Sequence, residues 1–267
     1  MDDADLDELR FLTRALRAHL DWQTSTGATG LERATQETRV AAARELVVSP
    51  APSREISAPP IAVAAEPLLR APLPMAPADA PQRLAALAEV VSRCTRCGLC
   101  EQRTQTVFAR GTGSSGVCFV GEGPGADEDA QGLPFVGKAG QLLDRMIAAM
   151  GFDRDEVYVC NVVKCRPPDN RKPELEEMAA CLPYLHEQLE LIRPQVIVAL
   201  GATAVQGLLG TTEGITRLRG KWKRFGEIDV MPTFHPAYLL RTPAAKREVW
   251  EDLQEVMRRV VQGAPRR

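Results

Sequence analysis

Five cysteines are the side chains of this sequence with the clearest capacity for chemistry. Cys94, Cys97 and Cys100 follow one another at three-residue intervals, and Cys165 and Cys181 lie far downstream. A bacterial ferredoxin pattern would need a cysteine at position 104, where this chain has threonine, so a metal site must recruit the distant thiolates. Four thiolates can hold either zinc or a [4Fe–4S] cluster, and the spacing alone does not choose between them.

A glycine-rich turn is the second chemical feature. Residues 121–125 read Gly-Glu-Gly-Pro-Gly and directly follow an apolar run at 117–120. Three glycines and a proline let the backbone turn sharply and approach a ligand closely. The turn matches neither a dinucleotide-binding fingerprint nor a P-loop. Its acidic residues, at 122 and 127–129, would repel a phosphate and suit activation of water or stabilisation of positive charge. A solvated acidic turn is the alternative.

An aromatic ring and a histidine complete the set. Phe135 precedes a predicted helix, where it can belong to the core or serve as a stacking platform for a planar base. His235 is one of three histidines and directly follows the fourth predicted strand, where an active-site group belongs. Behind it, Leu239 and Leu240 are expected to be exposed and able to wedge into a base stack. Packing of the following helix is the other explanation for these leucines.

The elements that position these residues alternate between strands and helices. Strands are predicted at residues 117–120, 157–163, 195–200 and 227–234, and helices at 139–150, 173–191, 202–209 and 244–261. This alternation predicts a parallel sheet with helices on both faces. In such sheets the working residues lie at the carboxyl ends of the strands, so the turns that follow the strands should share one edge.

The first 82 residues differ in composition from the rest. Residues 1–23 carry apolar positions at steps of three and four, which predict an amphipathic helix. This helix either packs on the main domain or on another copy, or it docks a protein partner. Residues 24–82 are rich in alanine and proline, with nine prolines between Pro50 and Pro81, and predict a flexible linker of low order.

Net charge and the search for targeting signals bear on the expected binding partners and on the expected location in the cell. The net charge is −2, but residues 83–267 carry 25 basic against 23 acidic side chains, so a local basic face for DNA is available. Residues 217–224 can supply it, or can equally form a solvated hairpin. No apolar run could span a membrane and no secretory signal is present, so we expect a cytoplasmic protein without a membrane partner. In the reducing cytosol cysteines are seldom paired, so we expect metal ligands or buried thiols and no disulfide framework. Cys118 and Cys160 should be buried within strands.

Taken together, four stretches resemble the family 4 (type IV, iron–sulfur) uracil-DNA glycosylases. They are residues 94–97, 121–140, 161–171 and 235–241, and the resemblance covers about residues 85–260. It implies a three-layer α/β/α domain at 83–267 with a four-stranded parallel sheet. It also implies a [4Fe–4S] cluster on Cys94, Cys97, Cys165 and Cys181, with Cys100 as a spare.

The resemblance further implies a hydrolase of base excision repair. Such an enzyme flips uracil out of single- or double-stranded DNA and hydrolyses its N-glycosidic bond. Its partner is uracil-containing DNA, and we expect a monomer. Leu239 and Leu240 would fill the gap in the stack, and Arg241 would hold a phosphate.

Roles in the base pocket follow from the same resemblance. Gly121 and Gly123 would shape the pocket, Phe135 would stack on the flipped base, and Asn161 would read the edge of the base. His235 would donate a hydrogen bond to uracil O2. The classical uracil glycosylases carry an aspartate at the position of Gly123, so the role of positioning water either moves to another acid or is dispensed with. Glu122 and Glu128 are equal candidates for it.

Three other functions compete with this interpretation. A related class of glycosylase links covalently to the DNA sugar through a histidine near residues 161–171, and residues 170–172 contain none. An iron–sulfur DNA-binding or redox module without glycosylase activity would keep the cysteines but would not need Phe135, Asn161 and His235 together. A nucleotide-binding enzyme could use the glycine-rich turn, but the acidic residues argue against it.

Overall fold

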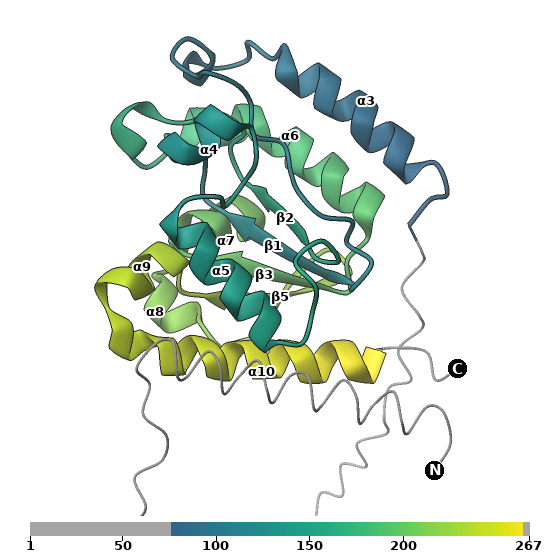
Figure 1. The fold of residues 1–267 in the computed structure, drawn as a ribbon, viewed down its shortest axis with the longest axis vertical. Coiled ribbons are helices and arrows are strands. Elements are labelled where there is room, and N and C mark those ends of the chain that lie inside the picture. The colour runs from purple at the N-terminus through teal and green to yellow at the C-terminus, as the bar shows by residue number, and fades with distance from the viewer. Residues whose placement is uncertain (1–75, 264–267) are drawn as a thin grey trace, which may run out of the picture. The chain divides into compact units, whose positions relative to one another are not determined.

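The architecture is a sheet with helices on both faces, seen in a computed structural model that describes residues 76–263 (Figure 1). The described residues belong to one of two compact units of the chain, and the other unit, Gln23–Ala71, lies outside them. The helix predicted at 1–23 and almost all of the linker predicted at 24–82 also lie outside the described residues. Helix α3, Ala80–Ser92, begins within the last residues assigned to that linker.

Five strands form the sheet, in the order β2-β1-β3-β5-β4. The four parallel strands are the predicted ones: β1 Val117–Gly121, β2 Tyr158–Asn161, β3 Val196–Leu200 and β5 Ile228–Thr233. The fifth, β4 Lys223–Phe225, pairs antiparallel with β5 at the edge, so the prediction of a purely parallel four-stranded sheet is wrong. Three residues from a basic run carry no apolar pattern, which is usual for a short edge strand.

The core lies on both faces of the sheet because its central strands are fully buried. All five residues of β1 and of β3 are buried, as expected for parallel strands covered on both sides. Alternate residues of β1 face opposite ways: Cys118 and Val120 join one apolar cluster, and Val117 and Phe119 join the other.

Helices cover the two faces in two groups (Figure 1). The first cluster includes residues of α3, of α6 Leu175–Ile192 and of α7 Ala202–Leu209, and α3 packs on α6. The second includes residues of α5 Lys138–Ala149 and α10 Lys246–Gly263. Shorter helical segments are α4 Ala126–Gln131, α8 Ile215–Leu218, α9 Pro236–Arg241, η1 Gly98–Cys100, η2 Pro168–Asn170 and η3 Pro243–Ala245.

The carboxyl ends of the parallel strands share one edge, as predicted. Gly121 at the end of β1 is in register with Asn161 at the end of β2, and Leu200 of β3 is in register with Thr233 of β5. The Gly201 N–H donates to the Thr233 carbonyl at 2.8 Å, which joins the turns after β3 and β5. This edge gathers the turns that carry the candidate site residues.

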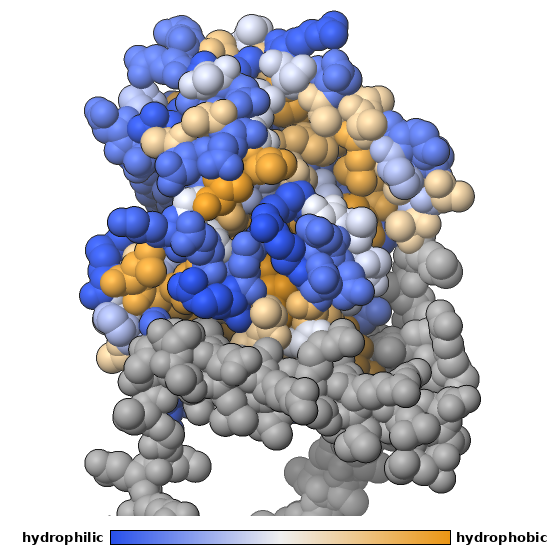
Figure 2. All heavy atoms as spheres, viewed as in Figure 1, coloured by the Kyte–Doolittle hydropathy of each residue, from blue (hydrophilic) through white to orange (hydrophobic). Residues whose placement is uncertain are grey.

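The surface of the described part is mixed. On the face drawn in Figure 2, apolar groups lie among hydrophilic ones and form no continuous apolar sheet. Between residues 76 and 263, no helix combines the length and the apolar character needed to cross a membrane.

Candidate active site and cysteine pocket

Two side chains approach the glycine-rich turn closely at the edge of the sheet. A Cβ atom added to Gly121 would lie 2.4 Å from Asn161 Oδ1 and 2.5 Å from Phe135 Cζ. Both separations are far below any real contact of a Cβ atom. Glycine at 121 is therefore what lets the amide and the aromatic ring approach the same point of the backbone.

Phe135 is held in an unusual conformation. Its φ is +56°, in the left-handed region that side-chain-bearing residues seldom occupy. Its ring is 5% exposed and stacks against His235, with the ring centroids 5.6 Å apart and the planes inclined by 30°. Backbone strain of this kind persists where the surroundings enforce it, and it is common at functional sites. The stacking brings the predicted aromatic platform and the predicted histidine together.

Glu128 helps to hold the backbone next to Phe135 in place. Its Oε1 accepts hydrogen bonds from the main-chain N–H groups of Val136 and Gly137, each at 2.9 Å. Its Oε2 accepts from the Gly125 N–H at 3.1 Å. The carboxylate therefore fastens the glycine-rich turn to the loop that carries Phe135. Each oxygen of this carboxylate therefore accepts at least one hydrogen bond from the main chain.

Glu122 has a different environment. Its Oε2 accepts a hydrogen bond of 2.5 Å from the hydroxyl of Thr203, a buried residue on α7. Within the described residues, no protein group donates to the other oxygen, Oε1. The sequence offered no reason to rank one glutamate above the other. In the structure, Oε1 of Glu122 accepts no hydrogen bond from residues 76–263, whereas each carboxylate oxygen of Glu128 accepts at least one. Thr203 was not predicted, although its place just after β3 is on the edge where site residues belong.

Asn161 presents a polar atom without a partner. The residue is 1% exposed, and its Oδ1 is fully buried with no hydrogen-bond donor among residues 76–263. Buried polar atoms nearly always have a partner, so an unpaired oxygen in a pocket wall marks a place where a ligand can donate. Asn161 ends β2 opposite Gly121, so this oxygen faces the turn and the ring of Phe135.

His235 is fixed as a neutral imidazole. It is the N-cap of α9, and its Nδ1 accepts a hydrogen bond of 3.1 Å from the Ala237 N–H. Burial lowers the pKa of His235 to about 4, and the positive charge of Arg241 adds to the effect. Near neutral pH the ring is uncharged, and with Nδ1 acting as an acceptor the proton resides on Nε2. The side chain thus offers one N–H donor to the pocket.

Gly123 leaves no room for the acid found there in the classical enzymes. A Cβ atom at this position would lie 2.7 Å from Cγ2 of Val163. A larger side chain would therefore have to displace the Val163 methyl group.

The segment after His235 is a helix, which corrects one expectation. In α9, Leu239 is 1% exposed and belongs to the apolar cluster shared with α5, so the prediction that both leucines are exposed is wrong for it. Successive helical residues point about 100° apart, and the two leucines therefore cannot share a face. Leu240 is 45% exposed, and Arg241 is exposed beside it.

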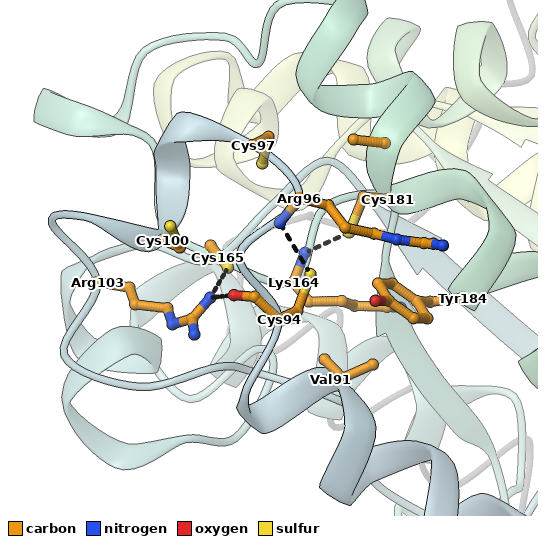
Figure 3. A pocket seen from close by; sticks show the side chains of 11 residues that line it. Val91, Cys94, Arg96, Cys97, Cys100, Arg103, Lys164, Cys165, Cys181 and Tyr184 are labelled. Atoms are coloured by element: carbon orange, nitrogen blue, oxygen red, sulfur yellow. Dashed lines mark hydrogen bonds between the residues drawn. The ribbon is translucent and has the colours of Figure 1, made fainter.

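The cysteines converge on a second pocket, shown in Figure 3. Five of them line it together with Arg96, Arg103 and Lys164: Cys94, Cys97, Cys100, Cys165 and Cys181. They come from the segment after α3, the loop after β2, and α6. Hydrogen bonds reach three of the sulfurs, from the Arg96 N–H to Cys94 at 3.5 Å, from Arg103 to Cys165 at 3.2 Å, and from the Lys164 N–H to Cys181 at 3.3 Å.

Burial favours the protonated form of three thiols of this pocket. Burial raises the pKa of Cys97 and of Cys165, and raises that of Cys181 to about 11. Metal binding displaces such protons, because the thiolate is the ligand. Over residues 76–263, no three histidine, cysteine or acidic side chains are arranged to hold a single metal ion. Cys118 and Cys160 lie apart from this set and are fully buried in β1 and β2, as predicted.

Part of the predicted basic surface is engaged within the fold. Arg219 pairs with buried Asp252 at 2.7 Å, and Arg224 pairs with Glu227 at 3.0 Å. Of the basic stretch at 217–224, the side chains of Arg217 and Lys221 remain exposed. The stretch is thus partly a solvated hairpin that includes β4 and partly an exposed basic surface.

Comparison with known proteins places the chain in a family. The model of the Uracil DNA glycosylase superfamily matches residues 108–254, more than half of the chain. A type-4 uracil-DNA glycosylase of Thermotoga maritima is 48% identical over 175 residues, which cover 63% of this chain and 90% of that protein. The type-4 enzymes of Sulfurisphaera tokodaii and Saccharolobus solfataricus are 44% and 41% identical, over 80% and 83% of their lengths.

Proposed function

The chain belongs to the uracil-DNA glycosylase superfamily, and from this premise we propose that it is a type-4 enzyme that hydrolyses the N-glycosidic bond of uracil in DNA. The product would be an abasic site for base excision repair. The observation that carries the proposal is the convergence of Gly121, Phe135, Asn161 and His235 at one edge of the sheet. We assign the activity to the domain at 83–267.

Recognition of uracil rests on Phe135 and Asn161. A flipped base would stack on the ring face of Phe135, while N3–H of uracil donates to the unpaired Asn161 Oδ1. The amide nitrogen of Asn161 would in turn donate to uracil O4. Cytosine presents an acceptor and a donor in the reverse order, which leaves these groups unpaired at a cost of about 1–3 kcal/mol each.

His235 stabilises the leaving group. When the C1′–N1 bond breaks, its electron pair goes to the uracil ring and negative charge develops at O2. The Nε2–H of the neutral imidazole donates to that oxygen, while Nδ1 stays occupied by the Ala237 N–H. A fixed donor at a developing anion contributes roughly 10²–10³-fold in rate.

Glu122 positions the attacking water. Its free Oε1 accepts a hydrogen bond from a water molecule whose oxygen attacks C1′ of the cation-like sugar, and the water proton passes to the carboxylate or to solvent. Glu128 holds the shape of the pocket through three backbone N–H groups. The geometry thus supports separate roles for the two glutamates.

Binding of DNA would use the surface around α9. Leu240 is exposed at the end of this short helix and suits insertion into the gap that a flipped nucleotide leaves. Arg241 is exposed next to it and suits a phosphate contact. Leu239 anchors the helix to the core, so its contribution to the wedge is indirect. Arg217 and Lys221 add exposed positive charge for the DNA backbone.

We assign a [4Fe–4S] cluster to Cys94, Cys97, Cys165 and Cys181, with Cys100 as a spare thiol beside them. The cysteine pocket fits such a group because thiols from three segments line it and N–H donors reach three of the sulfurs. In such a cluster each iron takes its own thiolate, so the thiols need not meet at one ion. When bound, the cluster would act as a cross-link between these segments, and bond cleavage needs no electron from it.

The decisive experiment is incubation with uracil-containing DNA, single- and double-stranded, followed by alkali. We expect strand breaks at uracil and none at cytosine or thymine. Intact strands from the iron-loaded wild-type protein would refute the proposed function. The cluster is tested separately, because a colourless protein that contains zinc and no iron would contradict it.

A further inference from the structure

Lys164 lines the cysteine pocket, contacts Asn161, and has no role in the reaction described above. Its side chain is 1% exposed, although lysine is rarely buried without a partner. Its Nζ donates a hydrogen bond of 2.7 Å to the main-chain oxygen of Asn161. Its main-chain N–H donates to Sγ of Cys181 at 3.3 Å (Figure 3). One residue therefore contacts a proposed cluster ligand and the proposed uracil reader.

The hydrogen bonds around Lys164 fix it from several directions. Its own carbonyl accepts from the Val107 N–H at 2.8 Å. The two residues between Asn161 and Lys164 continue the pairing with the glycine-rich turn, since the Val162 and Val163 N–H groups donate to Gly121 and Glu122. The lysine side chain folds back over this short segment to reach Asn161. It therefore closes a loop of chain whose two ends are the base reader and the cysteine segment.

Strand β2 is last in the strand order, and an isolated bridge joins its Val159 to Arg110. The Asn161 carbonyl takes its donor from the Lys164 side chain. The side-chain amide of Asn161 is aimed by its main chain, and Gly121 and Phe135 leave it little free space. A small rotation of the Asn161 peptide would move Oδ1 away from the position where it meets uracil N3–H. A charge-assisted hydrogen bond at the carbonyl resists that rotation.

We propose that Lys164 is a positioning residue for uracil recognition, holding the Asn161 amide in register with the base and linking its orientation to the cysteine segment. This inference rests on the proposed function, because it concerns how the pocket reads uracil. The donor Nζ acts through Asn161 and does not touch the base itself.

The test compares Lys164→Met, which keeps the length of the side chain and removes its donor, with the wild-type protein. We expect inhibition by free uracil to weaken by about tenfold or more, as expected when a charged hydrogen bond to a buried group is lost. Binding of DNA that carries an abasic site should change by less than about twofold, because no base is present to be read. The matched control is Lys246→Met on α10, for which both quantities should stay at the wild-type level.

A double-mutant cycle separates positioning from general damage to the fold. In an Asn161→Ala background, Lys164→Met should have little further effect on inhibition by uracil, because the group that it positions is gone. Equal effects of Lys164→Met in the two backgrounds would overturn the proposal. So would loss of abasic-site binding in parallel with loss of uracil binding, since that pattern indicates a merely structural role.

Two measurements keep the test decisive. Melting temperature and visible absorbance establish whether Lys164→Met is folded and carries iron. If it does not fold, Lys164→Gln takes its place. Glutamine retains an N–H donor on a shorter side chain, so this variant should lose inhibition by uracil only in part. A Gln variant indistinguishable from wild type in uracil inhibition would then refute the role of the ammonium group. If the wild-type protein releases no uracil, the proposed function and this inference fall together. If it is active and Lys164→Met is inhibited by uracil as the wild type is, only this inference fails.

Discussion

Loss of charge at Glu128 should lower stability, whereas loss of charge at Glu122 should lower the reaction rate. In Glu128→Gln, the amide oxygen can still accept from Val136 and Gly137, but its NH2 group would face the Gly125 N–H where Oε2 now accepts. The charge-assisted hydrogen bond from the Gly125 N–H is lost, and this N–H then faces a second donor, the glutamine NH2 group. Bonds to charged groups contribute about 1.5–3 kcal/mol, so we expect the free energy of unfolding to fall by about that amount.

Glu122→Gln should leave stability almost unchanged. The Thr203 hydroxyl, which donates to Oε2 at 2.5 Å, can donate to the amide oxygen of glutamine instead. The water-facing oxygen is replaced by an NH2 group, which cannot accept the water proton. A positioned acid or base contributes about 10²–10⁴-fold, so kcat should fall by about 100-fold or more while the melting curve stays in place.

The assay pairs urea denaturation, followed by circular dichroism, with single-turnover release of uracil from DNA. Glu187→Gln, an exposed glutamate on α6, is the control for removal of one negative charge. The reasoning is refuted if Glu128→Gln loses 100-fold in rate at unchanged unfolding free energy while Glu122→Gln remains active. That result would make Glu128 the acid that positions water.

Three further predictions concern the histidine, the cysteines and α9. Because the folded-state pKa of His235 is about 4, below its unfolded value of about 6.5, kcat/KM should show no step near pH 6.5 and should fall only as pH approaches 4. The free energy of unfolding should also fall with falling pH. The contribution of the neutral His235 ring is present above the unfolded pKa and is lost as the pH falls from there through 4. Unfolding measured over a range of acid pH values tests this. Cys181→Ser should lose visible absorbance and iron, whereas Cys100→Ser should retain both; equal iron content in the two variants would contradict the ligand assignment. Leu239→Ala should lower the unfolding free energy by about 2–5 kcal/mol, and Leu240→Ala should instead leave it within about 0.5 kcal/mol and slow uracil release from duplex DNA.

Much of the fold follows from local pattern. The four parallel strands are apolar runs bounded by turn residues, and burial on both faces makes such runs visible in the sequence. Once the strands are parallel, their carboxyl ends must share an edge, so Gly121 and His235, which directly follow predicted strands, were expected there from their positions. Asn161 lay within the strand predicted at 157–163, and its place in the site was suggested by the family resemblance. The family motifs added the expected base and the expected cluster ligands.

Other features depend on partners far away in the sequence. Strand β4 forms because β5 offers a free edge, and its own residues carry no strand pattern. The burial of Leu239 depends on the packing of α9 against α5, which no local spacing announces. An apolar residue in a loop-like stretch was therefore expected at the surface and lies in the core.

The division of labour between the two glutamates shows the limit most clearly. As residue types in one acidic turn, Glu122 and Glu128 are chemically equivalent. Their environments differ because the loop carrying Phe135 folds back to give Glu128 its N–H donors, whereas α7 presents only the Thr203 hydroxyl to Glu122. Sequence alone determined which elements form and which residues share the sheet edge, because burial and periodicity are local. Tertiary structure alone decided which carboxylate oxygen has no donor within residues 76–263, because hydrogen-bond partners are set by the folding of distant segments.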